Sequence, residues 1–206
     1  MTFIVGQPNV VGTEGDDDLF GNHGADDYIV GEGGNDFIKG LTGNDLIEGG
    51  DGDDTIRAGL GDDCVHGGDG NDFILAAEGN DTAFGNFGND TIIGKSGEDL
   101  LHGGRDDDSI RGGSSDDTVI GGKGNDFVAG DDGDDRVVGG EGIDTLVGGS
   151  GADVFVAGLG DIIADFDASE GDTIQLDGSD LAIEMNEFGL VEIVDAAADT
   201  NGLDMF

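Results

Sequence analysis

Apolar residues recur with a period of nine along most of the chain. Counted from Gly12, sixteen units of nine residues run to Val156, with one extra residue at Val30 between the second and third units. Position eight of every unit is apolar, and positions seven to nine are rich in β-branched and aromatic residues. Side chains alternate along a strand, so position eight should face inward and positions seven and nine outward. The pattern predicts one very short strand per unit and a thin core.

Glycine marks the turns between these strands. It occupies position one in fourteen of the sixteen units, with Ala58 and Ala76 as the exceptions. It also occupies position four in fourteen units, with Asp106 and Ser115 as the exceptions. Closely spaced glycines permit positive φ and a close approach of neighbouring backbone. A nine-residue unit can reverse direction only once, so two units form one coil, and units n and n+2 stack at about 4.8 Å. We therefore expect an all-β stack of eight coils, about 40 Å long.

Aspartate fills position six in every unit, and stacking would align these residues in two rows. Carboxylates of neighbouring coils repel one another unless a cation lies between them. Ca²⁺ accepts six to eight carboxylate and carbonyl oxygens, whereas Mg²⁺ requires a tighter octahedron. The seven gaps in each row set an upper estimate of about fourteen Ca²⁺. The expected ligands are Asp17, Asp26, Asp36, Asp45, Asp54, Asp63, Asp72, Asp81, Asp90, Asp99, Asp108, Asp117, Asp126, Asp135, Asp144 and Asp153.

The overall charge agrees with a multivalent cation as partner. The chain of 206 residues has 48 Asp and Glu against 7 Lys and Arg, for a formal net charge of -41. Nucleic acid, anionic lipid and acidic polysaccharide would be repelled unless a metal bridges them. Zinc would need His or Cys clusters, and His23, His66 and His102 are too few and too scattered. Cys64, the only cysteine, rules out an internal disulfide and is expected to be a small strand residue.

Three of the units, GGDGNDFIL (67–75), GGKGNDFVA (121–129) and GGEGIDTLV (139–147), resemble the nonapeptide of the RTX, or haemolysin-type, calcium-binding proteins. The resemblance covers residues 12–156. It implies a right-handed parallel β-roll in which each coil holds Ca²⁺ through the Asp carboxylate and backbone carbonyls of the turn. The carbonyls expected to serve are those of Gly49, Gly52, Gly67, Gly70, Gly85, Gly88, Gly121, Gly124, Gly139 and Gly142.

The composition changes at either end of the repeats. Residues 1–11 are expected to form a lead-in strand, residues 12–156 the roll, and residues 157–206 a capping and secretion-signal region. Segments 161–166, 172–177, 181–186 and 190–195 read as strands, the last two forming a hairpin, and their expected role is to cap the stack. Segment 163–176 resembles the region after the repeats in serralysin-like proteins, which implies an uncleaved C-terminal signal read by a type I exporter. The final residues, LDMF, are similar to the ends of such substrates.

We expect a secreted calcium protein with a structural, adhesive or export-assisting role. At low cytosolic Ca²⁺ the charge would keep the chain unfolded, and outside the cell calcium binding would drive folding. The chain has no H-E-x-x-H or G-x-S-x-G motif, no N-terminal signal peptide and no membrane-spanning run, so neither an enzyme nor membrane insertion is expected. The alternatives are the non-catalytic end of a larger secreted protease, lipase or epimerase, and a module that binds a cell surface or polysaccharide through Ca²⁺, or binds ice. The seventh positions lack the regular Thr ladder that an ice face would need.

Overall fold

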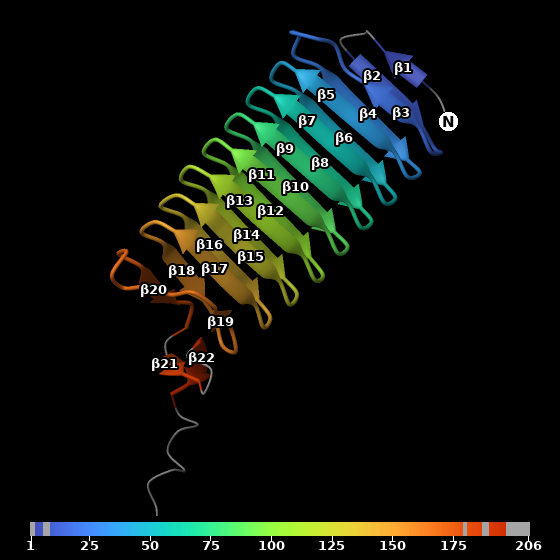
Figure 1. The fold of residues 1–206 in the computed structure, drawn as a ribbon. Coiled ribbons are helices and arrows are strands. Elements are labelled where there is room, and N and C mark those ends of the chain that lie inside the picture. The colour runs from blue at the N-terminus through green and yellow to red at the C-terminus, as the bar shows by residue number, and fades with distance from the viewer. Residues whose placement is uncertain (1–2, 6–8, 179–180, 187–189, 197–206) are drawn as a thin grey trace, which may run out of the picture.

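The chain forms an elongated stack of short parallel strands. The computed structural model describes residues 3–5, 9–178, 181–186 and 190–196, and all regular structure within them is β-strand. The N-terminal strands lie at one end, and each coil adds to the stack along a single axis (Figure 1). The first strands are β1 (Phe3–Val5), β2 (Asn9–Thr13), β3 (Asp18–Phe20), β4 (Tyr28–Gly33), β5 (Phe37–Thr42), β6 (Leu46–Asp51), β7 (Thr55–Leu60), β8 (Cys64–Asp69), β9 (Phe73–Glu78), β10 (Thr82–Phe87) and β11 (Thr91–Ser96). The remaining strands are β12 (Leu100–Arg105), β13 (Ser109–Ser114), β14 (Thr118–Lys123), β15 (Phe127–Asp132), β16 (Arg136–Glu141), β17 (Thr145–Ser150), β18 (Val154–Ala157), β19 (Ile162–Ile163), β20 (Thr173–Leu176), β21 (Leu181–Met185) and β22 (Val191–Asp195).

Successive strands alternate between two sheets. One sheet contains the odd-numbered strands β1 to β19 followed by β22 and β21, and the other contains the even-numbered strands β2 to β20. Each strand pairs in parallel with the strand two places along, so Ile56 aligns with Ile74 and Ile74 with Ile92, eighteen residues apart. Two nine-residue units therefore make one coil. This confirms the predicted parallel β-roll.

The core is one apolar side chain deep in each sheet. The residue at position eight is fully buried in strand after strand, as Ile38, Ile74 and Leu146 illustrate. Its neighbours at positions seven and nine are mostly half-buried or exposed on the outer face, as alternation along a strand requires. Position one also faces inward and is nearly always glycine, because a Cβ atom there would overlap the buried aspartate Oδ2 of the same coil.

The turns depend on positive φ. Gly52 and its counterparts at position four mostly have φ above 100°, where a Cβ atom is strongly disfavoured. Eight residues other than glycine also have positive φ, and theirs are confined to 74–99°. Asp106 and Ser115, the two exceptions at position four, are among these eight, so both turns keep the left-handed conformation without glycine.

The second unit has a register that differs from the expected one. Ile29 is the fully buried residue of β4 and pairs with Ile47, whereas Tyr28 aligns with position seven of the next coil. The additional residue therefore lies in the preceding turn and not at Val30. That turn contains Gly24, whose φ of 75° and bonds to Thr42 mark the widened loop.

The stack continues past the expected last repeat. Strands β19 and β20 pair in parallel with β17 and β18 and so add another coil after residue 156. Strand β22 then pairs antiparallel with β19 and with β21, which confirms the predicted strands at 181–186 and 190–195. Val191 and Ile193 are buried in the same core cluster as Phe155 and Ile163. This antiparallel pair covers the C-terminal end of the hydrophobic core.

The N-terminal lead-in consists of two strands, because β1 joins the odd sheet and β2 the even sheet. The expected hairpin connection at 187–189 and the LDMF ending lie outside the described residues. Within the part of the chain that is described, no helix is long and apolar enough to cross a lipid bilayer.

Candidate calcium-binding rows

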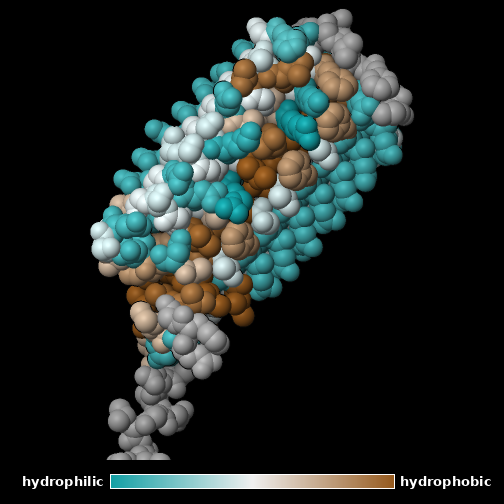
Figure 2. Space-filling view, in the orientation of Figure 1, coloured by the Kyte–Doolittle hydropathy of each residue, from teal (hydrophilic) through white to brown (hydrophobic). Residues whose placement is uncertain are grey.

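Eighteen buried aspartates line the inner side of the turns in two rows. Each has at most 8% of its surface exposed. The turns that carry them form the edges of the stack, and Figure 2 shows a continuous hydrophilic edge beside a broad face with hydrophobic patches. We call the residues on the turns leading into odd-numbered strands the first row: Asp17, Asp36, Asp54, Asp72, Asp90, Asp108, Asp126, Asp144 and Asp161. The second row, on the turns leading into even-numbered strands, is Asp27, Asp45, Asp63, Asp81, Asp99, Asp117, Asp135, Asp153 and Asp172.

One oxygen of each carboxylate ties neighbouring coils together. The backbone N–H of Asp54 donates to Oδ1 of Asp72 at 2.8 Å, and the N–H of Asp72 donates to Oδ1 of Asp90 at 2.8 Å. The second row has the same bonds, for example from the N–H of Asp63 to Oδ1 of Asp81. All of these bonds run in one direction, from each coil to the next coil along the chain.

The other carboxylate oxygen has no such partner in the interior of the rows. Fourteen Oδ2 atoms are buried without a hydrogen bond, seven in each row. A buried carboxylate oxygen left without a donor is strongly destabilising, so it must gain a proton or a cation. These atoms belong to Asp36, Asp45, Asp54, Asp63, Asp72, Asp81, Asp90, Asp99, Asp108, Asp117, Asp126, Asp135, Asp144 and Asp153.

Position-one glycines leave room for these oxygens. A Cβ atom added to Gly49 would overlap both Oδ2 of Asp54 and the carbonyl oxygen of Gly67 in the next coil. A Cβ atom at Gly121 would likewise meet Oδ2 of Asp126 and the Gly139 carbonyl. A carboxylate oxygen and a carbonyl oxygen from adjacent coils thus approach one another where a side chain is missing. Oxygen donors of these two kinds are the ligands that Ca²⁺ prefers.

Seven of the ten glycine carbonyls predicted as ligands fall into two groups. Those of Gly49, Gly67, Gly85 and Gly139, at position one, lie beside an aspartate Oδ2 of the preceding coil. Those of Gly52, Gly70 and Gly124, at position four, instead approach the position-four glycine of the following coil. The first group lies beside carboxylate oxygens that have no hydrogen-bond donor.

Burial shifts the titration of the rows. It raises the pKa of Asp36, Asp81, Asp90, Asp135 and Asp144 to about 6, that of Asp54, Asp63, Asp72, Asp99 and Asp117 to about 7, and that of Asp108 to about 8. The hydrogen bond from the preceding coil lowers each pKa, and in most cases a neighbouring aspartate charge raises it further. The pKa of Asp45, Asp126 and Asp153 is raised for the same reasons. In this fold the rows favour protons unless a cation replaces them.

The ends of the rows differ from the interior. Oδ2 of Asp17 accepts the Thr13 N–H at 2.8 Å, and Oδ2 of Asp27 accepts the Asn22 N–H at 2.5 Å. At the other end, Oδ2 of Asp161 accepts the Gly158 N–H at 2.7 Å. In the second row, Oδ2 of Asp172 accepts the Asp167 N–H at 2.8 Å. Two carboxylates at each end of the stack therefore have backbone donors where the interior ones have none.

Fifteen of the sixteen predicted aspartates lie in the two rows. The exception is Asp26, which is exposed and accepts the N–H of Asn44 on the outside of the turn, while Asp27 takes the buried place. The regular spacing of the repeats does not predict Asp161 and Asp172, because they follow Asp144 and Asp153 by 17 and 19 residues and not by 18. A signal was present, since each is followed two residues later by an apolar strand residue, as in every repeat.

An outer row of Asn and Asp side chains accompanies the buried ones. At position five, Oδ1 of Asp53 accepts the N–H of Asn71 at 2.8 Å, and Oδ1 of Asn71 accepts that of Asn89 at 2.8 Å. These bonds run from each coil to the preceding one, opposite to the buried bonds. Because the side chains are exposed to water, they stabilise the turns without requiring a cation.

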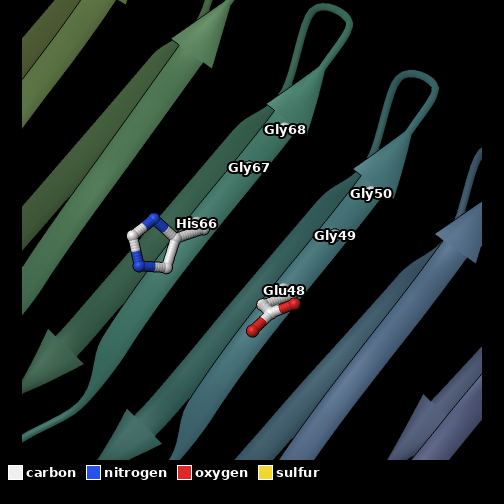
Figure 3. A pocket seen from close by; sticks show the side chains of 6 residues that line it. All are labelled: Glu48, Gly49, Gly50, His66, Gly67 and Gly68. Carbon is white, nitrogen blue, oxygen red and sulfur yellow. The ribbon is translucent and has the colours of Figure 1, made fainter.

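Side chains of His, Cys, Asp and Glu alone form no metal centre in the described part of the chain, the two rows included, so a calcium site in the rows would also need backbone carbonyl oxygens. No group of three or more such side chains is placed to hold a metal among the described residues. On the even sheet, Glu48 and His66 project from neighbouring strands beside a shallow groove floored by glycines (Figure 3). Cys64 Sγ lies 3.9 Å from His66 Nε2, and burial, followed by the charge of Glu48, raises the thiol pKa. Cys64 is therefore not an activated nucleophile.

Comparison with known families identifies the repeat. The pattern described as the RTX calcium-binding nonapeptide repeat matches residues 9–37, 30–65, 66–101, 93–128 and 129–161, which together run unbroken from 9 to 161. The chain belongs to this RTX family. A search of curated protein sequences found no match. Membership in the RTX family makes calcium binding the activity of these repeats.

The residues present fit calcium as the bound ion. The RTX repeats supply fourteen buried carboxylate oxygens without donors, and eight of them lie beside a carbonyl oxygen of the adjacent coil. When bound, the ion would neutralise the carboxylates and link adjacent coils. The interior aspartates and the position-one carbonyls are the residues of this chain that would hold it.

Proposed function

We propose that the protein is a secreted calcium-dependent folding module whose two aspartate rows bind several Ca²⁺ ions. The fourteen buried Oδ2 atoms without donors carry this proposal, because they make the metal-free fold unfavourable at neutral pH. Calcium binds only the folded rows, so its binding energy becomes folding energy. The chain is unfolded in a calcium-poor cytosol and folds at millimolar extracellular Ca²⁺.

A calcium titration followed by circular dichroism tests the proposal. Strand signal should appear cooperatively with added Ca²⁺ and be absent in excess chelator at pH 7.5. Mg²⁺ should act only at much higher concentration, because it gives up its waters reluctantly. Full strand signal in chelator would contradict the coupling of binding to folding, and equal midpoints for the two ions would contradict calcium as the preferred ion.

Export through a type I machinery is the second part of the proposal. The serralysin-like segment 163–176 and the acidic-then-apolar ending LDMF support it. Outside the cell the role is structural or adhesive and not catalytic; in a longer chain this module would be the non-catalytic part. Removal of residues 203–206 should abolish calcium-dependent accumulation of the protein outside cells that carry a type I exporter. Unchanged export would contradict this part alone.

A polysaccharide partner is a second candidate, and the outer face of the odd sheet favours it. Four of the seven basic side chains, Lys39, Arg57, Lys95 and Arg111, lie on this face. At the outward positions seven, nine and two of the odd-numbered strands from β3 to β17, the only acidic residues are Asp18 and Asp131. Asp131 forms an ion pair with Arg111.

Aromatic rings accompany these cations on the same face. Lys39 Nζ lies 4.9 Å from the centre of the Phe37 ring, and Arg57 Cζ lies 5.7 Å from it. Such a face suits an acidic polysaccharide once calcium has neutralised the turns. Lys39→Glu with Arg57→Glu should weaken binding of polygalacturonate in calcium, while Lys123→Glu, on a strand of the even sheet, should not. Equal binding by both variants would remove this candidate.

A further inference from the structure

Each gap in the interior of a row is the space between the aspartates of two successive coils. The coil that comes first in the chain, the lower coil, supplies the Oδ2 without a donor. The coil that follows it, the upper coil, supplies the Oδ1 that accepts the N–H of the lower coil's aspartate. The last unpartnered Oδ2 atoms belong to Asp144 in the first row and Asp153 in the second. The upper wall of these last gaps therefore comes from the segment after the repeats.

Two aspartates of that segment form the missing wall. The N–H of Asp144 donates to Oδ1 of Asp161 at 2.9 Å, and the N–H of Asp153 donates to Oδ1 of Asp172 at 3.0 Å. Both residues are buried, with 0% and 8% of their surface exposed. A Cβ atom at Gly139 would lie 2.9 Å from Oδ2 of Asp161 and would overlap Oδ2 of Asp144, so the two carboxylates share one space.

The opposite end of each row is already complete without an ion. Oδ2 of Asp17 accepts both the N–H and the hydroxyl of Thr13, at 2.8 and 2.9 Å. Asp27 accepts the Asn22 N–H at Oδ2 and the Asn22 side-chain amide at Oδ1, the latter at 2.7 Å. The first gap in each row thus has donors in the place that a cation would take.

We propose that Asp161 and Asp172 form part of the last calcium site of each row through Oδ1, while their Oδ2 atoms accept the N–H groups of Gly158 and Asp167. Neither residue lies in the sixteen nine-residue units counted from Gly12. Asp17 and Asp27 bind no calcium, and their carboxylates end the array through backbone and side-chain donors. The array therefore begins at Asp36 and Asp45 and closes on Asp161 and Asp172. This inference rests on the proposed function, because it assigns positions within the same two rows.

Calcium stoichiometry of matched variants tests the assignment. Asp→Asn keeps the Oδ1 acceptor and removes the charge, so the variants Asp161→Asn, Asp172→Asn, Asp17→Asn and Asp27→Asn can be compared directly. Native mass spectrometry at saturating Ca²⁺ should show fourteen ions on the wild type, one for each unpartnered Oδ2. Asp161→Asn and Asp172→Asn should each lose one ion, and Asp17→Asn and Asp27→Asn should lose none. Loss of an ion from the second pair, or full stoichiometry in the first pair, would overturn the inference.

A crystal structure of the wild type grown in Ca²⁺ provides a test that does not depend on variant folding. Anomalous density for an ion should appear between the coils of Asp144 and Asp161 and be absent between those of Asp17 and Asp36. Density in the reverse arrangement would overturn the inference while leaving calcium binding intact. A wild type that binds no calcium in solution would instead refute the proposed function itself.

Discussion

The backbone N–H of Asp54 donates to Oδ1 of Asp72 at 2.8 Å, while Oδ2 of Asp72 is buried without a donor. One side chain thus holds two coils together through Oδ1 and places an Oδ2 without a hydrogen-bond donor beside the next coil. Structure and ion binding are coupled within a single carboxylate.

Replacing Asp72 by Asn should remove calcium without breaking the hydrogen bond between coils. The amide oxygen can still accept the Asp54 N–H, but the charge is gone, so at least one ion should be lost. Isothermal titration calorimetry would give the stoichiometry. Asp53→Asn is the matched control, because Asp53 is exposed in the outer row and its Oδ1 acceptor is retained. Equal stoichiometry in the two variants would show that the buried row does not bind the ions.

Acid should stabilise the metal-free fold. Burial raises the pKa of Asp54 from 3.8 to about 7 and that of Asp108 from 3.8 to about 8, so the folded state binds more protons than the unfolded chain between these limits. The proton-linked stability is fully present below pH 3.8 and is lost as the pH rises through about 6 to 8. In excess chelator, strand signal by circular dichroism should be larger at pH 5 than at pH 8. A signal that increases with pH would contradict this sign.

Calcium binding should release protons for the same reason. The ion replaces protons on the raised carboxylates, so calorimetry near pH 7 in buffers of different ionisation enthalpy should give different apparent enthalpies. Calcium affinity should fall as the pH is lowered from 8 to 6. Identical enthalpies in all buffers would indicate that the rows are already ionised before calcium binds.

Gly52→Ala should destabilise the roll through its turn. Gly52 has φ of 125°, outside the range of 74–99° that other residues reach here, and an added Cβ would overlap the Gly34 carbonyl. We expect a cost of about 1–3 kcal/mol, seen as a higher calcium concentration at the folding midpoint. Gly15→Ala at the same repeat position is the control, because nothing lies within 4 Å of its added Cβ. If both variants fold at the same calcium concentration, the turn at Gly52 is not strained by a Cβ atom.

Ile74→Ala should reveal how much the thin core contributes. Ile74 is fully buried between two coils, so its truncation should cost about 2–5 kcal/mol in urea unfolding at saturating Ca²⁺. Ile143→Ala, with 61% of its surface exposed, should change the free energy of unfolding by less than about 0.5 kcal/mol. Comparable losses would mean that ions alone, and not side-chain packing, set the stability.

The period of nine was sufficient to predict the strands, the two sheets and the two rows. Its strength lies in the pairing of an inward Asp with an inward apolar residue two positions later, as in Asp72 and Ile74, which fixes the register of each coil. The register of the second unit was predicted wrongly, because residues 25–29 (ADDYI) contain two adjacent aspartates, Asp26 and Asp27. Each is followed two residues later by an apolar or aromatic residue. Only the strand pairing of Ile29 with Ile47 decides between them.

The ends of the rows could not be derived from spacing. Asp161 and Asp172 lie in segments whose loops have lost the repeat length, and their role depends on hydrogen bonds between distant parts of the chain. Likewise, the donors that satisfy Asp17 and Asp27 come from turn geometry at Thr13 and Asn22. A periodic pattern describes the interior of a stack, but its termini are set by individual contacts.

The eighteen-residue offset between paired strands also governs how such a chain can change length. Inserting or deleting two whole units between Asp36 and Asp144 would return every following strand to its own sheet and alter each row by one aspartate. A single unit would move all later strands to the opposite sheet and send the C-terminal segment to the wrong row, where Asp161 and Asp172 exchange places. Because the two closing loops differ in length, they are not interchangeable. Gene duplications within this roll should therefore survive in steps of eighteen codons.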